Sequence, residues 1–434
     1  MKTLVRLAFI ALMISFCASA QAQQKFDDFA TRFIKGYKAL DLPELPLSYV
    51  EGFKNIKSAD GVQKQLNFFS GIERDLKQFD VNKLNANQKT DYRLIQYETK
   101  LNLSRVALEK QWLSSDHSAL PENGIINVPH GKEWYAYLLK RWISDEVTPD
   151  QIYQFGLKEV EKVKQHIEEV RKRTGLSEDA FYKRLNDPSF FIKDQRAVQD
   201  SFEHVKTIIY ANLYKQFNQT QFPDLKIEPG HDKALAQTPG FYTGNVFYYN
   251  LFDQPYNKRQ VDWLFIHEGV PGHHYQISMN ATAKGTGVQQ LFSYLGFIEG
   301  WGAYAEYLGK DLGVYRSPYD EMGKWEWDIV RSVRVPLDIG LNYYGWTDAQ
   351  ALDFWKKNIK NQDDIAMREI NRMRRWPAQV ITYKYGASQI LEWKQELQKR
   401  EGSKFNIKQF HDELLLGGAM PLFMLRERVL GSKS

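Results

Sequence analysis

The chain has 434 residues, of which 43% are hydrophobic, 14% aromatic and 26% charged. This much apolar material excludes a disordered or collagen-like chain, because burying it offsets the entropy lost on ordering. The 58 basic and 53 acidic side chains give a formal net charge of +5 with no dense Lys/Arg tract, which argues against nucleic acid as a partner.

Residues 1–22 are typical of a signal peptide. Lys2 and Arg6 provide the positively charged start, the apolar stretch 7–16 follows, and small residues suited to a signal peptidase come next. The apolar stretch is too short to span a bilayer well, so we expect no stable membrane insertion once the signal is removed. The alternative is an uncleaved membrane anchor.

The only cysteine, Cys17, lies inside the signal peptide. It suggests a lipoprotein, but bulky Phe16 precedes it where a lipoprotein signal has a small residue. The mature chain, residues 23–434, would therefore be exported without disulfides, either to the periplasm of a Gram-negative bacterium or out of the cell.

Most of the mature chain has helical periodicity, which predicts a single mostly α domain over 23–434 with sub-lobes whose boundary is open. In 149–175 apolar residues recur every three to five positions, Thr148 is placed to cap the first turn, and Gly175 is placed to end the helix. The amphipathic pattern of residues 386–400 predicts a further helix.

Strand-like sequence is concentrated at residues 240–250, which are rich in aromatic and β-branched side chains. We therefore expect a large helical body with a small β-sheet near the middle of the chain. The part at 246–250 could pair with an extended peptide at a sheet edge, or it could be a plain core strand.

Three of the nine histidines lie within the eight residues 267–274. Imidazole nitrogens bind Zn²⁺ well, and a hydrolytic zinc site has three protein ligands and one position for water. In the His-Glu-x-x-His motif the two histidines lie one helical turn apart. His267 is instead six residues from His273 and seven from His274, so neither pair could chelate one ion from an undistorted helix.

Pro271 and Gly272 lie between these histidines and favour a bulge or break in the helix. Such a break would let His273 reach the same ion as His267. We prefer His273 to His274 as the second ligand; the remaining histidine would face the substrate or pack beside the metal. The alternative is a His-rich turn between two helices.

Glu299 is the best candidate for a third ligand. It lies in an apolar, small-residue-rich helix, where an unpaired carboxylate would be costly to bury and a metal would compensate it. Glu306 lies two turns further on the same face and could orient a ligand by a hydrogen bond. The alternatives are a partly exposed carboxylate for Glu299 and a solvated or salt-bridged one for Glu306.

The string His-Glu-Gly-Val-Pro-Gly-His-His at 267–274, with Glu-Gly-Trp at 299–301, resembles the bacterial family called domain of unknown function 885. That family is similar to the gluzincin-like helical zinc metallopeptidases, whose third ligand is a glutamate. The resemblance runs from about Phe26 to the C-terminus. It implies a metallopeptidase-like helical body that holds one Zn²⁺.

Further segments carry the same resemblance, at 334–340, 376–386 and 417–422. The first of them contains Arg334 and Asp338, which are candidates for contacting the substrate or supporting the site.

Two residues depart from the family pattern. Gly302 stands where Ala is usual, a change we regard as minor. Asn342 stands where the family has a His, so this protein either uses Asn342 as a neutral donor or differs in its substrate.

These residues predict metal-assisted amide hydrolysis. Zinc would lower the pKa of a bound water, and Glu268 would accept the water's proton and pass it to the leaving amine. A donor must also stabilise the developing oxyanion, and Tyr383 is the first candidate, followed by His274 and Asn342. The alternative for Tyr383 is an ordinary tyrosine on a helix face.

Three arginines at 372, 374 and 375 precede Trp376. A forked guanidinium there, with Arg374 as the candidate, could bind the terminal carboxylate of a peptide. The alternative is a solvated basic surface.

The function predicted from the sequence is an exported zinc-dependent peptidase whose substrates are short peptides. The alternatives are a zinc hydrolase of a non-peptide amide or ester, and a binding or scaffold protein that retains the fold without turnover. Glu268 beside His267 argues against the scaffold, because a binder needs no base. The sequence leaves open the cleaved end, the native metal and the oligomeric state.

Overall fold

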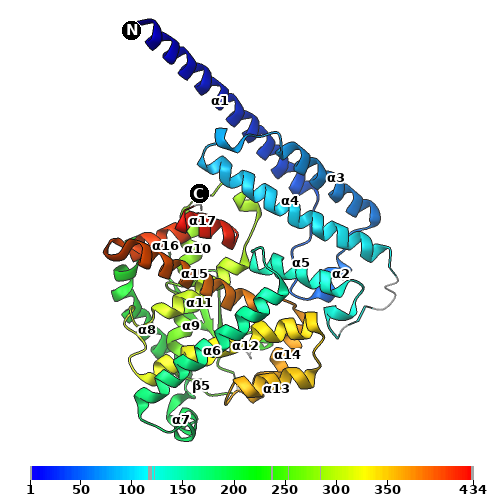
Figure 1. Cartoon of the computed structure of the whole chain (residues 1–434). Coiled ribbons are helices and arrows are strands. Elements are labelled where there is room, and N and C mark those ends of the chain that lie inside the picture. Colours follow the sequence, from blue (N-terminus) through cyan, green and yellow to red (C-terminus); the bar gives the residue numbers. More distant parts are fainter. Residues whose placement is uncertain are drawn as a thin grey trace. The chain divides into compact units, whose positions relative to one another are not determined.

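The computed structural model is mostly α, as predicted (Figure 1). The chain divides into two compact units, one formed by Met1–Leu120 with Gly285–Ser293 and the other by Pro121–Lys284 with Tyr294–Ser434. The sequence had left this boundary open. The residues described are 2–115, 120–121, 123–235, 238–252, 254–283 and 285–431.

The first unit is built on long helices with an aromatic core. Phe26 and Phe29 pack against Phe79, with ring centroids 5.2 and 5.1 Å apart respectively. In the predicted signal peptide, side chains up to residue 20 lie outside the described residues. No helix in the described part of the chain is long and apolar enough to cross a membrane. The helices are α1 (Lys2–Ala39), α2 (Tyr49–Lys54), α3 (Ala59–Leu76) and α4 (Ala86–Leu113).

The second unit holds the remaining helices. Two glycines let α11 and α15 approach closely, since a Cβ on Gly300 would lie 2.6 Å from the Cα of Gly386. The helices are α5 (Gly131–Ile143), α6 (Pro149–Thr174), α7 (Glu178–Leu185), α8 (Gln195–Gln216), α9 (Gln260–Glu268), α10 (His273–Thr282), α11 (Leu295–Ala305), α12 (Pro318–Ile339), α13 (Asp348–Asn358), α14 (Ala366–Arg375), α15 (Ile381–Glu401), α16 (Ile407–Leu415) and α17 (Leu422–Leu430).

Two predicted helices can be compared directly with the structure. Helix α6 has the predicted ends: Thr148 forms a capping box with Gln151, and Gly175 closes the helix with a φ of 71°. Helix α15 begins at Ile381, five residues before the predicted 386. Its first turns are buried on nearly every side, so they carry no amphipathic pattern that would mark the start.

The predicted sheet has three strands in the order β2 (Lys226–Pro229), β4 (Val246–Tyr249), β3 (Gly240–Thr243). Strand β2 is parallel to β4, and β3 is antiparallel to it in the register Gly240↔Tyr249. Strand β4 is therefore paired on both sides, and our suggestion that 246–250 receives a peptide is wrong. The edge strands of this sheet are β2 and β3. A second sheet pairs β1 (Phe191–Ile192) with β5 (Tyr256–Asn257).

Candidate metal centre

The helix that carries His267 ends at the next residue, and a new helix begins at His273. The predicted distortion is thus a complete break. The Val270–Pro271 peptide in it is cis. Gly272 is needed for the close approach, because a Cβ there would lie 1.9 Å from the carbonyl oxygen of His267. The break turns the chain back so that both imidazoles reach the same place.

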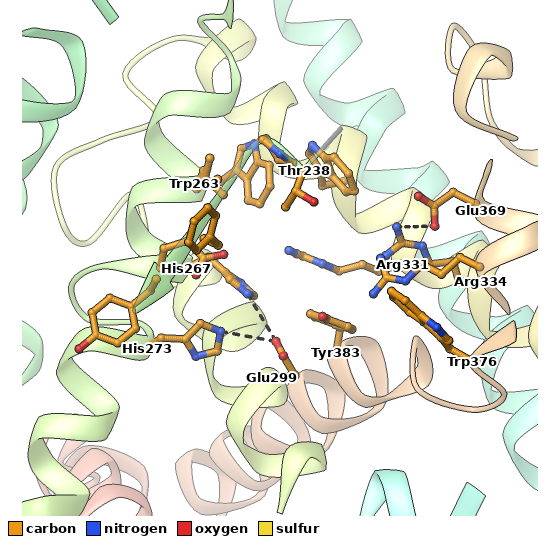
Figure 2. A pocket seen from close by; sticks show the side chains of 18 of the residues that line it. Thr238, Trp263, His267, His273, Glu299, Arg331, Arg334, Glu369, Trp376 and Tyr383 are labelled. Carbon is orange, nitrogen blue, oxygen red and sulfur yellow. Dashed lines mark ion pairs between the residues drawn. The ribbon is translucent and has the colours of Figure 1, made fainter. Parts of the chain in front are cut away.

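Three side chains from three helices converge at this break, as Figure 2 shows. The ligand atoms offered by His267, His273 and Glu299 all lie within 4.8 Å of one another. Oε2 of Glu299 is 3.7 Å from Nε2 of His267 and 3.5 Å from Nε2 of His273. The structure therefore brings together the three residues that the sequence proposed as ligands. Two imidazoles and one carboxylate are a donor set that suits Zn²⁺ in hydrolytic sites.

A buried carboxylate orients the first imidazole. Nδ1 of His267 lies 2.8 Å from Oε1 of Glu306, and Glu306 also accepts hydrogen bonds of 2.6 and 2.7 Å from Arg331. Because an ionised carboxylate only accepts hydrogen bonds, His267 donates from Nδ1, so Nε2 is the nitrogen that faces the centre, where a bound cation would replace its proton. Glu306 is thus buried and paired, as the orienting role requires.

The electrostatics of the centre favour an ionised carboxylate next to imidazole. Burial opposes charge on both groups, but the nearby imidazoles of His267 and His273 hold the pKa of Glu299 below its ordinary value. Burial likewise disfavours the charged form of His267, yet the carboxylates of Glu299 and Glu306 raise the pKa of this imidazole to about 9. The carboxylate therefore attracts positive charge at this point, which a bound cation would also supply.

The centre opens into a cavity of about 540 Å³ that is also lined by Glu268 and Tyr383. Burial raises the pKa of Glu268, which is the direction expected for a general base that works near neutral pH. The Tyr383 ring lies 6.2 Å from the His267 ring at 22°. Gln379 donates to its phenolic oxygen at 3.5 Å, so the phenol keeps its own hydrogen for another acceptor.

His274 lies away from the cavity. Its Nε2 is 2.8 Å from the carbonyl oxygen of Pro223, and its Nδ1 is 3.2 Å from the hydroxyl of Tyr242. Burial lowers its pKa, which suits a neutral imidazole that donates on one side and accepts on the other. The placement removes His274 from the candidates for ligand and oxyanion donor.

Asn342 and Asp338 also lie outside the cavity lining. Asn342 donates to the carbonyl of Met373 at 3.0 Å. Asp338 accepts from the hydroxyl of Tyr135 at 2.7 Å and from the backbone N–H of Ala378 at 2.9 Å. These hydrogen bonds join distant segments of the second unit. Asn342 and Asp338 therefore stabilise the fold and do not have the contact with substrate that we expected.

The two predicted arginines have different positions. Arg334 lines the cavity and forms an ion pair of 2.7 Å with Glu369. Arg374 instead binds Asp348 at 2.7 Å and the carbonyl of Trp346 at 3.0 Å, on the opposite face of α14. Our choice of Arg374 is therefore corrected. The arginines of α14 that face the cavity are at 368, 372 and 375.

Sequence reasoning also missed Arg331 and the strand beside the centre. Arg331 is one helical turn before Arg334 on α12, and this spacing could have revealed it. Gly240, Phe241 and Tyr242 of β3 line the cavity next to α9. Their role could not be read from sequence, because it depends on which strand lies at the sheet edge.

Residues 105–429 match the family described as "Bacterial protein of unknown function (DUF885)". The chain belongs to this family. No curated protein matches the chain. The crystal structure of a "putative lipoprotein" from Colwellia psychrerythraea is similar, with 25% identity, a TM-score of 0.67, and coverage of 96% of this chain and 75% of that one.

A second solved structure shares the fold. It is a "putative lipoprotein of unknown function" from Shewanella oneidensis, with 16% identity, a TM-score of 0.67, and coverage of 95% of this chain and 99% of that one. At this identity the likeness supports the fold alone.

Gly302, where we expected Ala from the sequence, lies against the ring of His267. A Cβ at this position would be 2.8 Å from Cε1 and 3.0 Å from Nδ1 of His267. Because Glu306 also fixes this ring, an added methyl would have to displace it. An alanine at this position would therefore not be neutral in this member of the DUF885 family.

Proposed function

We propose that this protein is a zinc-dependent peptidase that hydrolyses short peptides. The observation that carries the proposal is the convergence of His267, His273 and Glu299, whose ligand atoms lie within 4.8 Å of one another. A zinc ion held there would supply Lewis-acid activation of water and of the amide carbonyl.

The roles of the chain's own residues follow from their positions around the cavity. Glu268, next to a ligand and buried, accepts a proton from the attacking water and delivers it to the leaving amine. Tyr383 donates its phenolic hydrogen to the oxyanion that develops on the amide oxygen. Glu306 keeps His267 in the tautomer that has Nε2 free.

The edge strand β3 favours a peptide over another amide or an ester. Asn250 donates to the carbonyl of Pro239 at 3.0 Å, and pairing alternates along an antiparallel ladder. The backbone groups of Gly240 and Tyr242 therefore point away from β4, on the edge that borders the cavity. An extended peptide could add there as a further strand. A non-peptide hydrolase remains the alternative, and a scaffold without turnover gives Glu268 no role.

We also propose that the protein is exported and works in the periplasm or envelope of a Gram-negative bacterium. The support is the signal-like composition of residues 1–22 and the similarity to two solved proteins described as "putative lipoproteins".

The test compares the zinc-loaded wild type with Glu268→Gln on a mixture of short peptides. We expect the variant to keep one zinc and to lose hydrolysis by on the order of 10²-fold or more, because the base is gone and the ligands remain. Glu161→Gln, on an exposed part of α6, is the matched control and should stay fully active. Full activity in Glu268→Gln, or none in the zinc-loaded wild type, would contradict the proposal.

A further inference from the structure

One side of the cavity is built from arginines. Helix α12 contributes Arg331 and Arg334, and α14 contributes three arginines spaced four and three residues apart, which places them on one helix face. Figure 2 shows Arg334 and Trp376 across the cavity from His273. We call this set the arginine wall: Arg331, Arg334, Arg368, Arg372 and Arg375.

The carboxylates of the wall do not balance its positive charge. Glu369 lies 2.7 Å from Arg334 and 3.1 Å from Arg368, so this one carboxylate contacts both guanidiniums. Arg331 already forms an ion pair with Glu306. This leaves two arginines of α14 to be considered.

Arg372 has a neutral partner, since it donates to Oε1 of Gln379 at 2.9 Å. Arg375 lies over the ring of Trp376 at 5.5 Å, and Arg372 lies over the same ring at 5.3 Å. Among the described residues, neither of these two arginines has a carboxylate at ion-pair distance. The wall therefore carries an excess of positive charge beside the cavity.

Two donors of the wall are buried without a partner in the described part of the chain. They are the Nε atoms of Arg334 and Arg372. Burial lowers the pKa of Arg334 to about 10, because repulsion from Arg372 adds to desolvation and outweighs the attraction of Glu369. Burying uncompensated positive charge is costly, and an anion bound beside these guanidiniums would offset that cost.

We propose that the arginine wall binds a carboxylate of the substrate while the amide to be cleaved lies at the metal centre. A guanidinium presents two parallel N–H groups that match the two oxygens of a carboxylate. One cavity of about 540 Å³ contains both the wall and the centre, which limits the substrate to a short segment. The carboxylate has two possible sources, the free C-terminus of a peptide and an acidic side chain.

This inference rests on the proposed function only for the position of the cleaved bond, so binding and cleavage are tested separately. Binding is measured on the full-length Glu268→Gln protein loaded with zinc, by the rise in unfolding temperature that a ligand causes. The probes are N-acetyl-trialanine as the free acid, its C-terminal amide, and the same amide with a central glutamate. We expect the free acid to bind at least tenfold more tightly than the amide.

The glutamate-containing amide distinguishes the two possible sources of the bound carboxylate. If it binds like the free acid, the wall recognises any carboxylate; if it binds like the plain amide, the wall requires a free C-terminus. Either result supports the wall, provided that Arg372→Gln with Arg375→Gln removes the preference. Equal shifts with all three probes, or a preference that survives in the double variant, would overturn the proposal.

Arg374→Gln is the matched control, because it removes the same charge from the other face of α14. It should keep the preference for a carboxylate. Folding of each variant is checked by its unfolding temperature without probe. Where the glutamine variant is unstable, Arg372→Lys replaces it in the binding test. The lysine keeps the charge but loses the fork, so binding of the free acid should weaken without disappearing.

Cleavage is measured on one peptide library supplied with free and with amidated C-termini. If a free C-terminus is recognised, the wild type should cut at a fixed short distance from that end and leave the amidated copies intact. If any carboxylate serves, the cuts should keep a fixed distance from Asp or Glu in both libraries. Cuts unrelated to any carboxylate would contradict the wall. Absence of all cleavage, with the binding preference present, would contradict the proposed peptidase and leave the carboxylate site standing.

Discussion

Nδ1 of His267 and Oε1 of Glu306 lie 2.8 Å apart in a contact buried between α9 and the end of α11. This single contact determines which nitrogen of the imidazole faces Glu299. It also connects the centre to α12, because Arg331 binds the same carboxylate. The geometry of the centre therefore depends on residues outside the group of His267, His273 and Glu299.

Replacing Glu306 by Gln tests this dependence. The amide keeps an acceptor for His267 but removes the charge that Arg331 neutralises, so we expect zinc affinity to fall by about 10–100-fold. The free energy of unfolding should fall by ~3 kcal/mol or more, because Arg331 is left buried without its counter-charge. Competition with a zinc chelator and chemical denaturation measure the two effects. Unchanged zinc affinity would show that Glu306 does not orient the ligand.

Replacing Gly302 by Ala should disturb the same ring through a steric clash. The added Cβ would lie 2.8 Å from Cε1 of His267, so the ring has to move away from the position set by Glu306. We expect weaker zinc binding while the helix content stays unchanged. Ala303→Gly is the control, since it weakens the same helix by about 1 kcal/mol without adding an atom near the ring. Equal zinc affinity in the two variants would argue against the clash.

The adjacent histidines should behave differently on substitution. We expect His273→Gln to lose the zinc ion and His274→Gln to keep it, because only His273 lies beside Glu299. His274→Gln should lower the unfolding temperature slightly, through the contacts to Pro223 and Tyr242. Metal analysis of the purified proteins measures the difference. The reverse pattern would show that His274 is the ligand.

We expect the buried carboxyl group of Asp338 to make the free energy of unfolding depend on pH. Burial raises its pKa to about 7 from an ordinary value of 3.8. Between these values the folded state holds a proton that the unfolded state has released, so stability falls as the pH rises from 4 to 7. The loss from this group is about 4 kcal/mol at most, at 1.36 kcal/mol per pH unit.

Asp338→Asn should remove that loss. An asparagine oxygen can still accept from Tyr135 and Ala378, and it does not ionise. We expect the wild type and the variant to be similarly stable near pH 4, and the variant to be more stable near pH 8. Urea unfolding at several pH values measures this difference. Parallel stability curves for the two proteins would show that Asp338 does not titrate in this range.

The composition of the centre could be predicted from the sequence because its signals are local. Two histidines and a downstream glutamate indicate the donor set. Pro271 and Gly272, which lie between the histidines, indicate that the helix must break. Glu299 and Glu306 share one helix face by spacing alone. These features depend on donor chemistry and helical geometry, which a short segment carries in itself.

The misplaced residues have roles that depend on distant partners. Asp338 receives its hydrogen bond from Tyr135, far away along the chain, so no local pattern distinguishes it from a catalytic carboxylate. Arg374 and Arg372 are two positions apart on α14, and only tertiary packing decides which one faces the cavity. Strand β4 is central because β2 pairs with it, and β2 gave no recognisable signal in the sequence.

The most direct test of the account is anomalous diffraction at the zinc edge from crystals grown with zinc. We predict one peak about 2.0–2.2 Å from Nε2 of His267, Nε2 of His273 and a carboxylate oxygen of Glu299. A zinc-loaded crystal with no peak among these three side chains, or with zinc bound only elsewhere, would contradict the central claim.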